Sequence, residues 1–223
     1  MPSPATLVAA AAPTAPVPTP GGEEEEAAPL RPLGLLTAKP VIYATNVSEE
    51  DLAALQVPLV VQRVDARHAS GQSPEDAART HRYAALADLA QAAGVSTVLL
   101  AQHADDQAET VLLALSRGAG LPGLAAMPDA FERHGVRFGR PWLGVPAQAL
   151  RDALAQGGHA FVDDPSNADQ RYTRNRIRAV LMPAWDQAFP GFREALARTA
   201  AHAAQGQRLL DDVASIDLAQ TGE

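Results

Sequence analysis

A histidine and three carboxylates lie close together in the middle of the chain, at His103, Asp105, Asp106 and Glu109. An imidazole and carboxylates in such a group can hold a divalent cation or accept a proton. A structural role is the alternative, because acids in the first turn of a helix stabilise its dipole and Asp105 or Asp106 would serve as a cap. One cap does not account for all four side chains, so we expect a functional site.

The elements predicted on either side place this cluster at the end of a strand. Residues 95–101 are apolar and rich in β-formers, which predicts a buried strand. The residues after the cluster put Val111 and Leu112 on one face and are followed by Gly118, which predicts a helix with a glycine stop. Because ligands of open α/β sheets bind where a strand passes into a helix, this position favours a binding site.

An earlier strand and helix complete a strand–helix–strand unit. Residues 57–64 predict the strand, and Ser73-Pro74 with an acid at Asp76 predicts the start of the helix. Two strands joined in this way are expected to be parallel, with a right-handed crossover. We therefore predict an α/β domain over residues 57–145.

A helical region is predicted over residues 146–223. Its first helix is expected from Pro146 to Gln156, before two glycines. Residues 191–219 are rich in Ala and Leu and predict a longer helix. The packing residues expected on this second helix are Phe192, Leu196, Leu209 and Val213.

A local basic patch lies between these two helices, at Arg171, Arg174, Arg176 and Arg178. Since the chain carries a net charge of −8, a nucleic-acid partner would have to bind to such a local patch. The patch would contact phosphates of RNA or of a nucleotide, or it would be a solvated helix face paired with nearby acids. The residues themselves leave both interpretations open.

Four blocks of motifs follow one another from about residue 57 to residue 193. The first is His-x-Asp-Asp-Gln-Ala-Glu-Thr from His103, and the second is Arg-Gly-x-Gly-Leu-x-Gly-Leu-x-x-Met from Arg117 to Met127. The third is Arg140-Pro141, and the last comprises Asp164-Pro165-Ser166-Asn167, Asp169, Tyr172 and Arg174-Asn175-Arg176-Ile177-Arg178. Together and in this order they resemble the tRNA(Ile)-lysidine synthases.

The resemblance implies a fold and a reaction. The fold would be a partial, parallel-sheet nucleotide-binding domain like that of the PP-loop ATPases, followed by a helical region. In that family ATP adenylates the C2 oxygen of the anticodon wobble cytidine of an isoleucine tRNA. The amino group of free lysine then displaces AMP. The implied cofactors are ATP and Mg²⁺, and the implied partners are tRNA(Ile) and free lysine.

The resemblance also implies roles for individual side chains. Asp105, Asp106 and Glu109 would hold metal, ATP or the lysine amine, with Asp105 and Asp106 as the Mg²⁺ ligands. Arg117 would stabilise the negative charge of phosphate or tRNA. The implied catalytic residues are thus the three acids and Arg117. The further residues implied to bind ATP or the substrates are His103, Gly118, Gly120, Asp164, Arg174, Asn175 and Arg178.

Two features depart from the family pattern. The family's ATP site begins with a Ser-Gly-Gly-x-Asp-Ser loop whose backbone amides cradle pyrophosphate, and this chain does not contain that sequence. In addition, Gln102 stands where the family commonly has a second histidine. We therefore expect a truncated enzyme that binds ATP weakly. Complete loss of activity is the second expectation for such a chain. A non-catalytic RNA-binding remnant is the alternative function.

The N-terminal part of the chain has a different composition. Residues 1–28 are rich in Ala, Pro and Thr and include four consecutive glutamates, so we expect a disordered low-complexity segment. Residues 29–56 resemble a fragment of the YchF/Obg-like nucleotide hydrolases, in which an Asn-x-x-Glu motif recognises the base. Asn46 and Glu49 would supply that motif, which makes a nucleotide-binding module a third hypothesis.

Composition excludes several classes of site. The chain has no cysteine, so disulfides, thiolate zinc sites and a cysteine nucleophile are excluded. No stretch approaches the length of a membrane-spanning helix, and the N-terminus lacks the basic residues of signal and transit peptides. We therefore expect a cytoplasmic protein without a membrane partner. The sequence leaves the oligomeric state open.

Overall fold

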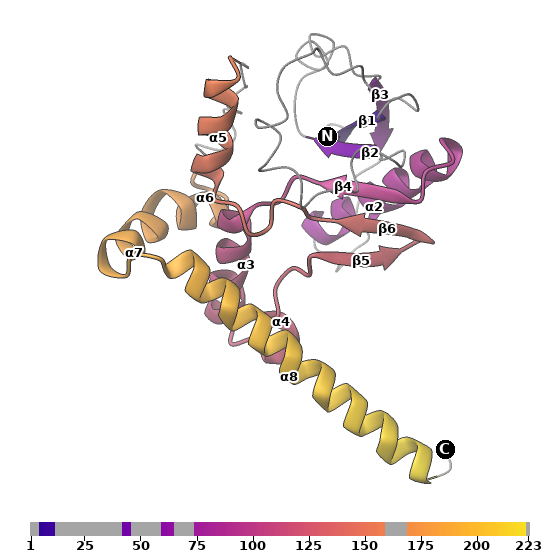
Figure 1. Cartoon of the computed structure of the whole chain (residues 1–223), viewed down its shortest axis with the longest axis vertical. Helices are drawn as coiled ribbons and strands as arrows, with labels where there is room; N and C mark the ends of the chain where they lie inside the picture. The colour runs from indigo at the N-terminus through magenta and orange to yellow at the C-terminus, as the bar shows by residue number, and fades with distance from the viewer. Residues whose placement is uncertain (1–4, 12–41, 46–58, 65–73, 159–168, 222–223) are drawn as a thin grey trace, which may run out of the picture. The chain divides into compact units, whose positions relative to one another are not determined.

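The structure is a computed structural model, and it describes residues 5–11, 42–45, 59–64, 74–158 and 169–221. The chain divides into two compact units, Met1–Ala101 with Ala130–Pro141 and Gln102–Asp129 with Trp142–Glu223. The first unit contains the sheet and the second is helical (Figure 1). We expected one boundary near residue 145. In the structure the acidic cluster and the helix after it belong to the helical unit, and only a hairpin returns to the sheet.

The described strands of the first unit form a mixed sheet with the order β3-β1-β2-β4-β6-β5. Strands β2, β4 and β6 are parallel, whereas β1 and β5 are antiparallel to their neighbours. β3 and β4 therefore point the same way, as predicted, although β1 and β2 lie between them. The predicted α/β class is confirmed. The strands are β1 (Ala5–Ala11), β2 (Ile42–Thr45), β3 (Leu59–Val64), β4 (Thr97–Leu100), β5 (Ala130–Arg133) and β6 (Val136–Gly139).

Strand β1 lies inside the segment that we expected to be disordered. Its residue Val8 is opposite Thr45 of β2 on one side and Val61 of β3 on the other. Pairing on both edges satisfies the backbone hydrogen-bonding groups, and this tertiary context overrides a composition that does not favour a strand. The expectation of disorder is wrong for Ala5–Ala11. The rest of residues 1–28 lies outside the described residues, as do Asn46 and Glu49.

Helix α2 (Pro74–Ala92) packs on the sheet through small and branched side chains. Leu86 of this helix is fully buried in one core cluster with Val98 of β4 and Phe138 of β6. The helix ends before Gly94, whose φ of +65° is readily adopted only by glycine. The core of this unit thus holds β4, the strand that precedes the acidic cluster in the sequence.

The second unit packs short helices around one long helix. The described helices are α3 (Ala104–Ser116), α4 (Leu121–Leu124), α5 (Ala147–Gln156), α6 (Thr173–Arg176), the π-helical η3 (Ile177–Leu181), α7 (Met182–Ala188) and α8 (Phe192–Thr221). Val111 and Leu112 of α3 are buried in one cluster with Phe192 and Leu196 of α8. The helices predicted after the acidic cluster and from Pro146 to Gln156 are confirmed.

Helix α8 is buried only along its N-terminal half. Phe192 and Leu196 are buried as predicted, but Leu209 is 64% exposed and Val213 is 46% exposed. The prediction that these two residues pack in the core is wrong, because α3 and α4 contact the first half of α8 and the helix continues beyond them (Figure 1). Neither α8 nor any other described helix combines the length and the hydropathy needed to cross a membrane.

Candidate substrate-binding site

The acidic cluster forms the first turns of α3. His103 precedes the helix in an extended conformation, and its N–H donates a hydrogen bond of 3.0 Å to Asp106 Oδ2. A carboxylate at the third helical position that accepts from the capping residue in this way stabilises the helix start. His103 Nδ1 lies 3.4 Å from the same oxygen. Asp106 therefore does cap the helix, but through one of its two oxygens.

Asp105 connects α3 to two other helices. Its Oδ2 accepts a hydrogen bond of 2.7 Å from the N–H of Ala147, the first residue of α5. Its Oδ1 accepts a hydrogen bond of 2.6 Å from Arg193 Nε of α8. Burial by itself raises the pKa of Asp105, but the Ala147 N–H and the Arg193 guanidinium together hold that pKa below its ordinary value. Asp105 is therefore an ionised structural carboxylate.

Glu109 is fully buried on the next turn of α3. Arg178 donates to its Oε1 from Nε at 2.8 Å, and Arg178 Nη2 lies 2.8 Å from the same oxygen. Arg174 Nη1 lies 3.4 Å from Glu109 Oε2. Burial raises the pKa of Glu109, and the contact with Arg178 opposes that rise. A buried carboxylate is thus paired with two arginines from another segment of the chain.

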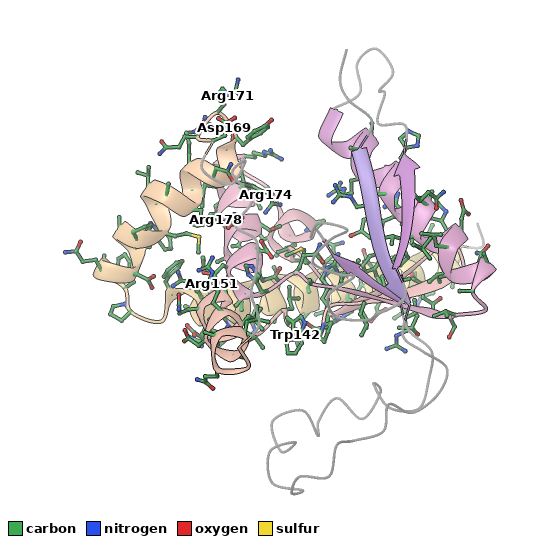
Figure 2. All side chains as sticks on the ribbon, turned by 90° about the horizontal axis from the view of Figure 1, so that it is seen from above. Trp142, Arg151, Asp169, Arg171, Arg174 and Arg178 are labelled. Atoms are coloured by element: carbon green, nitrogen blue, oxygen red, sulfur yellow. The ribbon has the colours of Figure 1, made fainter. Side chains whose placement is uncertain are left out.

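Both arginines come from the helical run that contains the π-helical turn η3. Arg174 lies in α6 and Arg178 in η3, and Figure 2 shows the two side chains on one part of this run. Turns of π-helix inside longer helices are often found at functional sites. Arg178 Nη2 also lies 3.6 Å from Asp106 Oδ1, so its guanidinium lies between two carboxylates. The side chains of Arg174 and Arg178 remain 41% and 38% exposed.

The predicted basic patch does not act as one surface in this structure. Arg171 pairs with Asp169 through hydrogen bonds of 2.7 and 3.0 Å, away from Arg174 and Arg178 (Figure 2). Arg176 donates to the backbone oxygens of Gln170 and Arg171. The pairing with acids that we considered for this patch is therefore present at Asp169 and at Glu109.

Asp105 and Asp106 do not fit a Mg²⁺ site in this arrangement. Three of their four carboxylate oxygens accept hydrogen bonds from Ala147, Arg193 and His103. The fourth, Asp106 Oδ1, faces the Arg178 guanidinium. Among the described residues, no group of three or more His, Cys, Asp or Glu side chains is arranged to hold a metal ion. We therefore derive no step through a metal bound to this pair.

The other predicted site residues are distributed over the second unit. Arg117 follows the last residue of α3, and the helix of 13 residues separates it from His103 by about 20 Å. Gly118 has a φ of +66°, and Gly120 precedes α4. Asn175 is buried, and its Nδ2 donates to the backbone oxygen of Asp169. Asp164 lies outside the described residues. Arg174 and Arg178 are thus the predicted residues that the structure brings to the acidic cluster.

The segment that contains the acidic cluster matches a known protein family. The family model described as a PP-loop domain matches residues 44–185, more than half of the chain. The chain belongs to the PP-loop family. The segment of this PP-loop protein that the model matches includes the acidic cluster and both arginines that pair with Glu109.

Relatives of this PP-loop protein carry a more specific name. A tRNA(Ile)-lysidine synthase of Polaromonas naphthalenivorans is 60% identical over 177 residues, which are 79% of this chain and 54% of that protein. One from Burkholderia mallei is 50% identical over 172 residues, 76% of this chain and 35% of that protein. These relatives confirm the resemblance that the motifs indicated. The chain spans about half or less of their length.

Among solved structures, the U34-tRNA thiolase NcsA from Methanococcus maripaludis aligns with a TM-score of 0.49 and 14% identity, over 65% of this chain and 46% of that one.

Two residues that contact the acidic turn or the second motif in this PP-loop protein were not predicted. Arg193 was missed because the sequence places it next to an apolar helix face, far from the cluster, and only the hydrogen bond to Asp105 reveals it. Gln107 lies inside the first motif but carried no assigned role. Its amide donates to the backbone oxygen of Met127 at 3.0 Å and accepts from the Met127 N–H at 3.1 Å. Gln107 therefore holds Met127, the last residue of the second motif, against α3.

We expect Gln107→Met to lower the free energy of unfolding by about 1–3 kcal/mol, because it leaves the backbone groups of Met127 without their partners. The side chain is 6% exposed, so water does not readily replace the lost bonds. Chemical denaturation measures the change. Gln148→Met, at an exposed glutamine of α5, is the control. Equal midpoints for the two variants would contradict the role of Gln107.

Proposed function

We propose that this PP-loop protein acts in an ATP-dependent modification of an isoleucine tRNA, in which lysine is joined to C2 of the anticodon wobble cytidine. Two findings support the proposal. The first is the 60% identity to a named tRNA(Ile)-lysidine synthase over 79% of the chain. The second is a pair of carboxylates, at Asp106 and Glu109, with a cationic group already bound between them. A protein acting on tRNA would work in the cytoplasm.

The geometry of Asp106 carries the assignment of the lysine amine. Asp106 Oδ2 is used by the helix cap, whereas Oδ1 is 3.6 Å from Arg178 Nη2, a distance too long for a hydrogen bond. This oxygen can accept an N–H from an incoming amine while the cap stays intact. The Arg178 guanidinium pairs more closely with Glu109, at 2.8 Å, and makes no hydrogen bond to Asp106 Oδ1. We therefore assign the lysine amine to Asp106. Glu109 would hold the Arg178 guanidinium in place beside this carboxylate.

The proposed reaction has two steps. In the first, the C2 oxygen of cytidine attacks the α-phosphorus of ATP and pyrophosphate leaves. In the second, the lysine nitrogen attacks C2, the bond from C2 to the adenylated oxygen breaks, AMP leaves and the nitrogen loses a proton. Negative charge develops on phosphate oxygens in both steps, and arginine side chains stabilise such charge. Arg174 and Arg178 are the candidates for that contact, since both remain partly exposed.

The first step has its own test. The chain is mixed with ATP and a transcript of the isoleucine tRNA, without lysine, and pyrophosphate release is measured. We expect pyrophosphate release that depends on the tRNA. Release should disappear when the wobble cytidine is replaced by uridine, because the proposed substrate base is cytosine. Release that is the same with both transcripts would contradict the proposal.

A second candidate function is RNA binding without catalysis. The observation that favours it is the absence of a Ser-Gly-Gly-x-Asp-Ser sequence from the chain. Binding through arginines would weaken steeply with salt, because counterions are released from the phosphates. Filter binding of the tRNA at several salt concentrations, read beside the pyrophosphate assay, separates the candidates. Salt-sensitive binding without any pyrophosphate release supports the second one.

Weak ATP binding is a separate expectation for this chain. Backbone amides at a glycine-rich loop supply much of the affinity for the phosphates of a nucleotide, and the family's loop sequence does not occur here. Isothermal titration calorimetry with ATP measures the dissociation constant directly. We expect binding weaker than the low-micromolar range, and low-micromolar binding would contradict this expectation.

A further inference from the structure

The start of α3 is attached to the start of α5 by two hydrogen bonds that run in opposite directions. The N–H of Ala147 donates to Asp105 Oδ2 at 2.7 Å, and the N–H of Ala104 donates to the backbone oxygen of Val145 at 3.0 Å. The turn that leads into α5 is closed by the Val145 N–H, which donates to the oxygen of Trp142 at 2.8 Å. Asp105 is the only side chain in this pair of bonds, so its orientation sets the geometry of the junction.

The orientation of Asp105 is in turn set from α8. Arg193 Nε donates to Asp105 Oδ1 at 2.6 Å. The other end of the same guanidinium is fixed, because Nη1 donates to both oxygens of Asp186 in α7 at 2.6 and 2.7 Å. The guanidinium also lies 4.7 Å from the ring centre of Phe192, which is buried. Arg193 is thus held on three sides and has little freedom to release Asp105.

The residues that Asp105 positions are those of the candidate site. His103 and Asp106 flank it in the sequence, and His103 Nδ1 lies 3.8 Å from Asp105 Oδ2. If the Asp105 carboxylate turns, the first turn of α3 loses the bond to Ala147 and keeps only the backbone bond from Ala104 to Val145, so His103 and Asp106 are less firmly held. Arg193 itself has no contact with Asp106 or Glu109 among the interactions found in the described residues.

We propose that Arg193 is a positioning residue, which acts through the Asp105 carboxylate to hold the first turn of α3, with His103 and Asp106, against the start of α5. Asp105 is accordingly a structural bridge and not a metal ligand. The consequence for lysine binding rests on the proposed function. The consequence for the junction itself does not, and the two can be measured separately.

Amide hydrogen exchange tests the junction without any substrate. Exchange of the Ala104 and Ala147 amides is followed by NMR in Arg193→Gln, and we expect it to become about tenfold faster, because a charge-assisted hydrogen bond is lost. Arg198→Gln, an exposed arginine of the same helix, is the matched control. Arg193→Lys keeps one charged contact and should give an intermediate rate. Equal rates in Arg193→Gln and Arg198→Gln would overturn the proposal.

A third variant separates positioning from general stability. Ala200→Gly lowers helix stability at a buried position of α8 that does not touch Asp105. At temperatures below the melting transition, we expect the amide exchange rates of Ala104 and Ala147 in Ala200→Gly to be close to those of the wild type. The same acceleration in Ala200→Gly as in Arg193→Gln would overturn the proposal, because loss of stability would then explain both.

The functional arm compares the KM for lysine in the same variants. Arg193→Gln should raise that KM about tenfold with a smaller change in kcat, whereas Arg198→Gln and Ala200→Gly should not. A KM unchanged in Arg193→Gln, in a wild type that does incorporate lysine, would overturn the positioning of Asp106. A wild type that incorporates no lysine contradicts the proposed function instead, and the exchange rates then still decide the role of Arg193.

Discussion

Replacing Arg178 by methionine is expected to lower the free energy of unfolding by about 3 kcal/mol, at the low end of the range for breaking a buried ion pair. Glu109 is fully buried, and Arg178 makes its two shortest contacts. Without the guanidinium, the buried carboxylate keeps Arg174, at 3.4 Å, as its one cationic partner among the described residues. Methionine keeps an unbranched apolar stem and removes the guanidinium, so the loss mainly reports the charge and its hydrogen bonds.

Chemical denaturation of matched variants tests this expectation. Arg151→Met, at an exposed arginine of α5, is the control and should change the midpoint little. Adding Glu109→Gln to Arg178→Met should recover part of the loss, because the uncompensated buried charge is then removed. A loss for Arg178→Met no larger than that of the control would show that the pair does not stabilise the unit.

Replacing Asp106 by asparagine is expected to raise the KM for lysine about 10- to 100-fold. This factor corresponds to the binding free energy of one hydrogen bond to a charged group. Asparagine keeps an oxygen that can accept the N–H of His103, so the helix cap survives and the fold should be unchanged. The negative charge proposed to hold the amine is lost. This separates binding from stability better than a change at the buried Glu109 would.

Steady-state kinetics with lysine as the varied substrate give the result. Asp212→Asn, an exposed aspartate of α8, is the control for a loss of one negative charge and should leave the KM unchanged. Circular dichroism melting checks that Asp106→Asn is folded to the same extent as the wild type. An unchanged KM for Asp106→Asn would show that the amine binds elsewhere.

The position of the candidate site could be proposed from the sequence because its carboxylates are local. His103 to Glu109 lie on two turns of one helix, and the strand before it has a clear apolar pattern. The sequence did not distinguish the three acids, since their roles depend on distant partners. Asp105 is bound by a residue 88 positions away, and Glu109 by one that is 69 positions away. Such pairing has no local sequence pattern.

The fold was predictable to a similar extent. The strand–helix–strand order followed from local patterns, and it is confirmed. Strand β1 was missed because its pairing with β2 and β3, and not its own composition, makes it a strand. The exposure of Leu209 and Val213 was missed because their own pattern favours burial but no partner covers them among the described residues. Their spacing suits a buried face, but α3 and α4 do not extend along that part of α8.

The most direct test of the central claim is the nucleoside content of the tRNA after incubation with the chain, ATP and lysine. The transcript is digested to nucleosides and analysed by mass spectrometry. The account predicts a cytidine that has gained lysine and lost water, formed only with ATP and only when the wobble base is cytidine. A transcript that contains no such nucleoside, at an ATP concentration that saturates the chain, would contradict it.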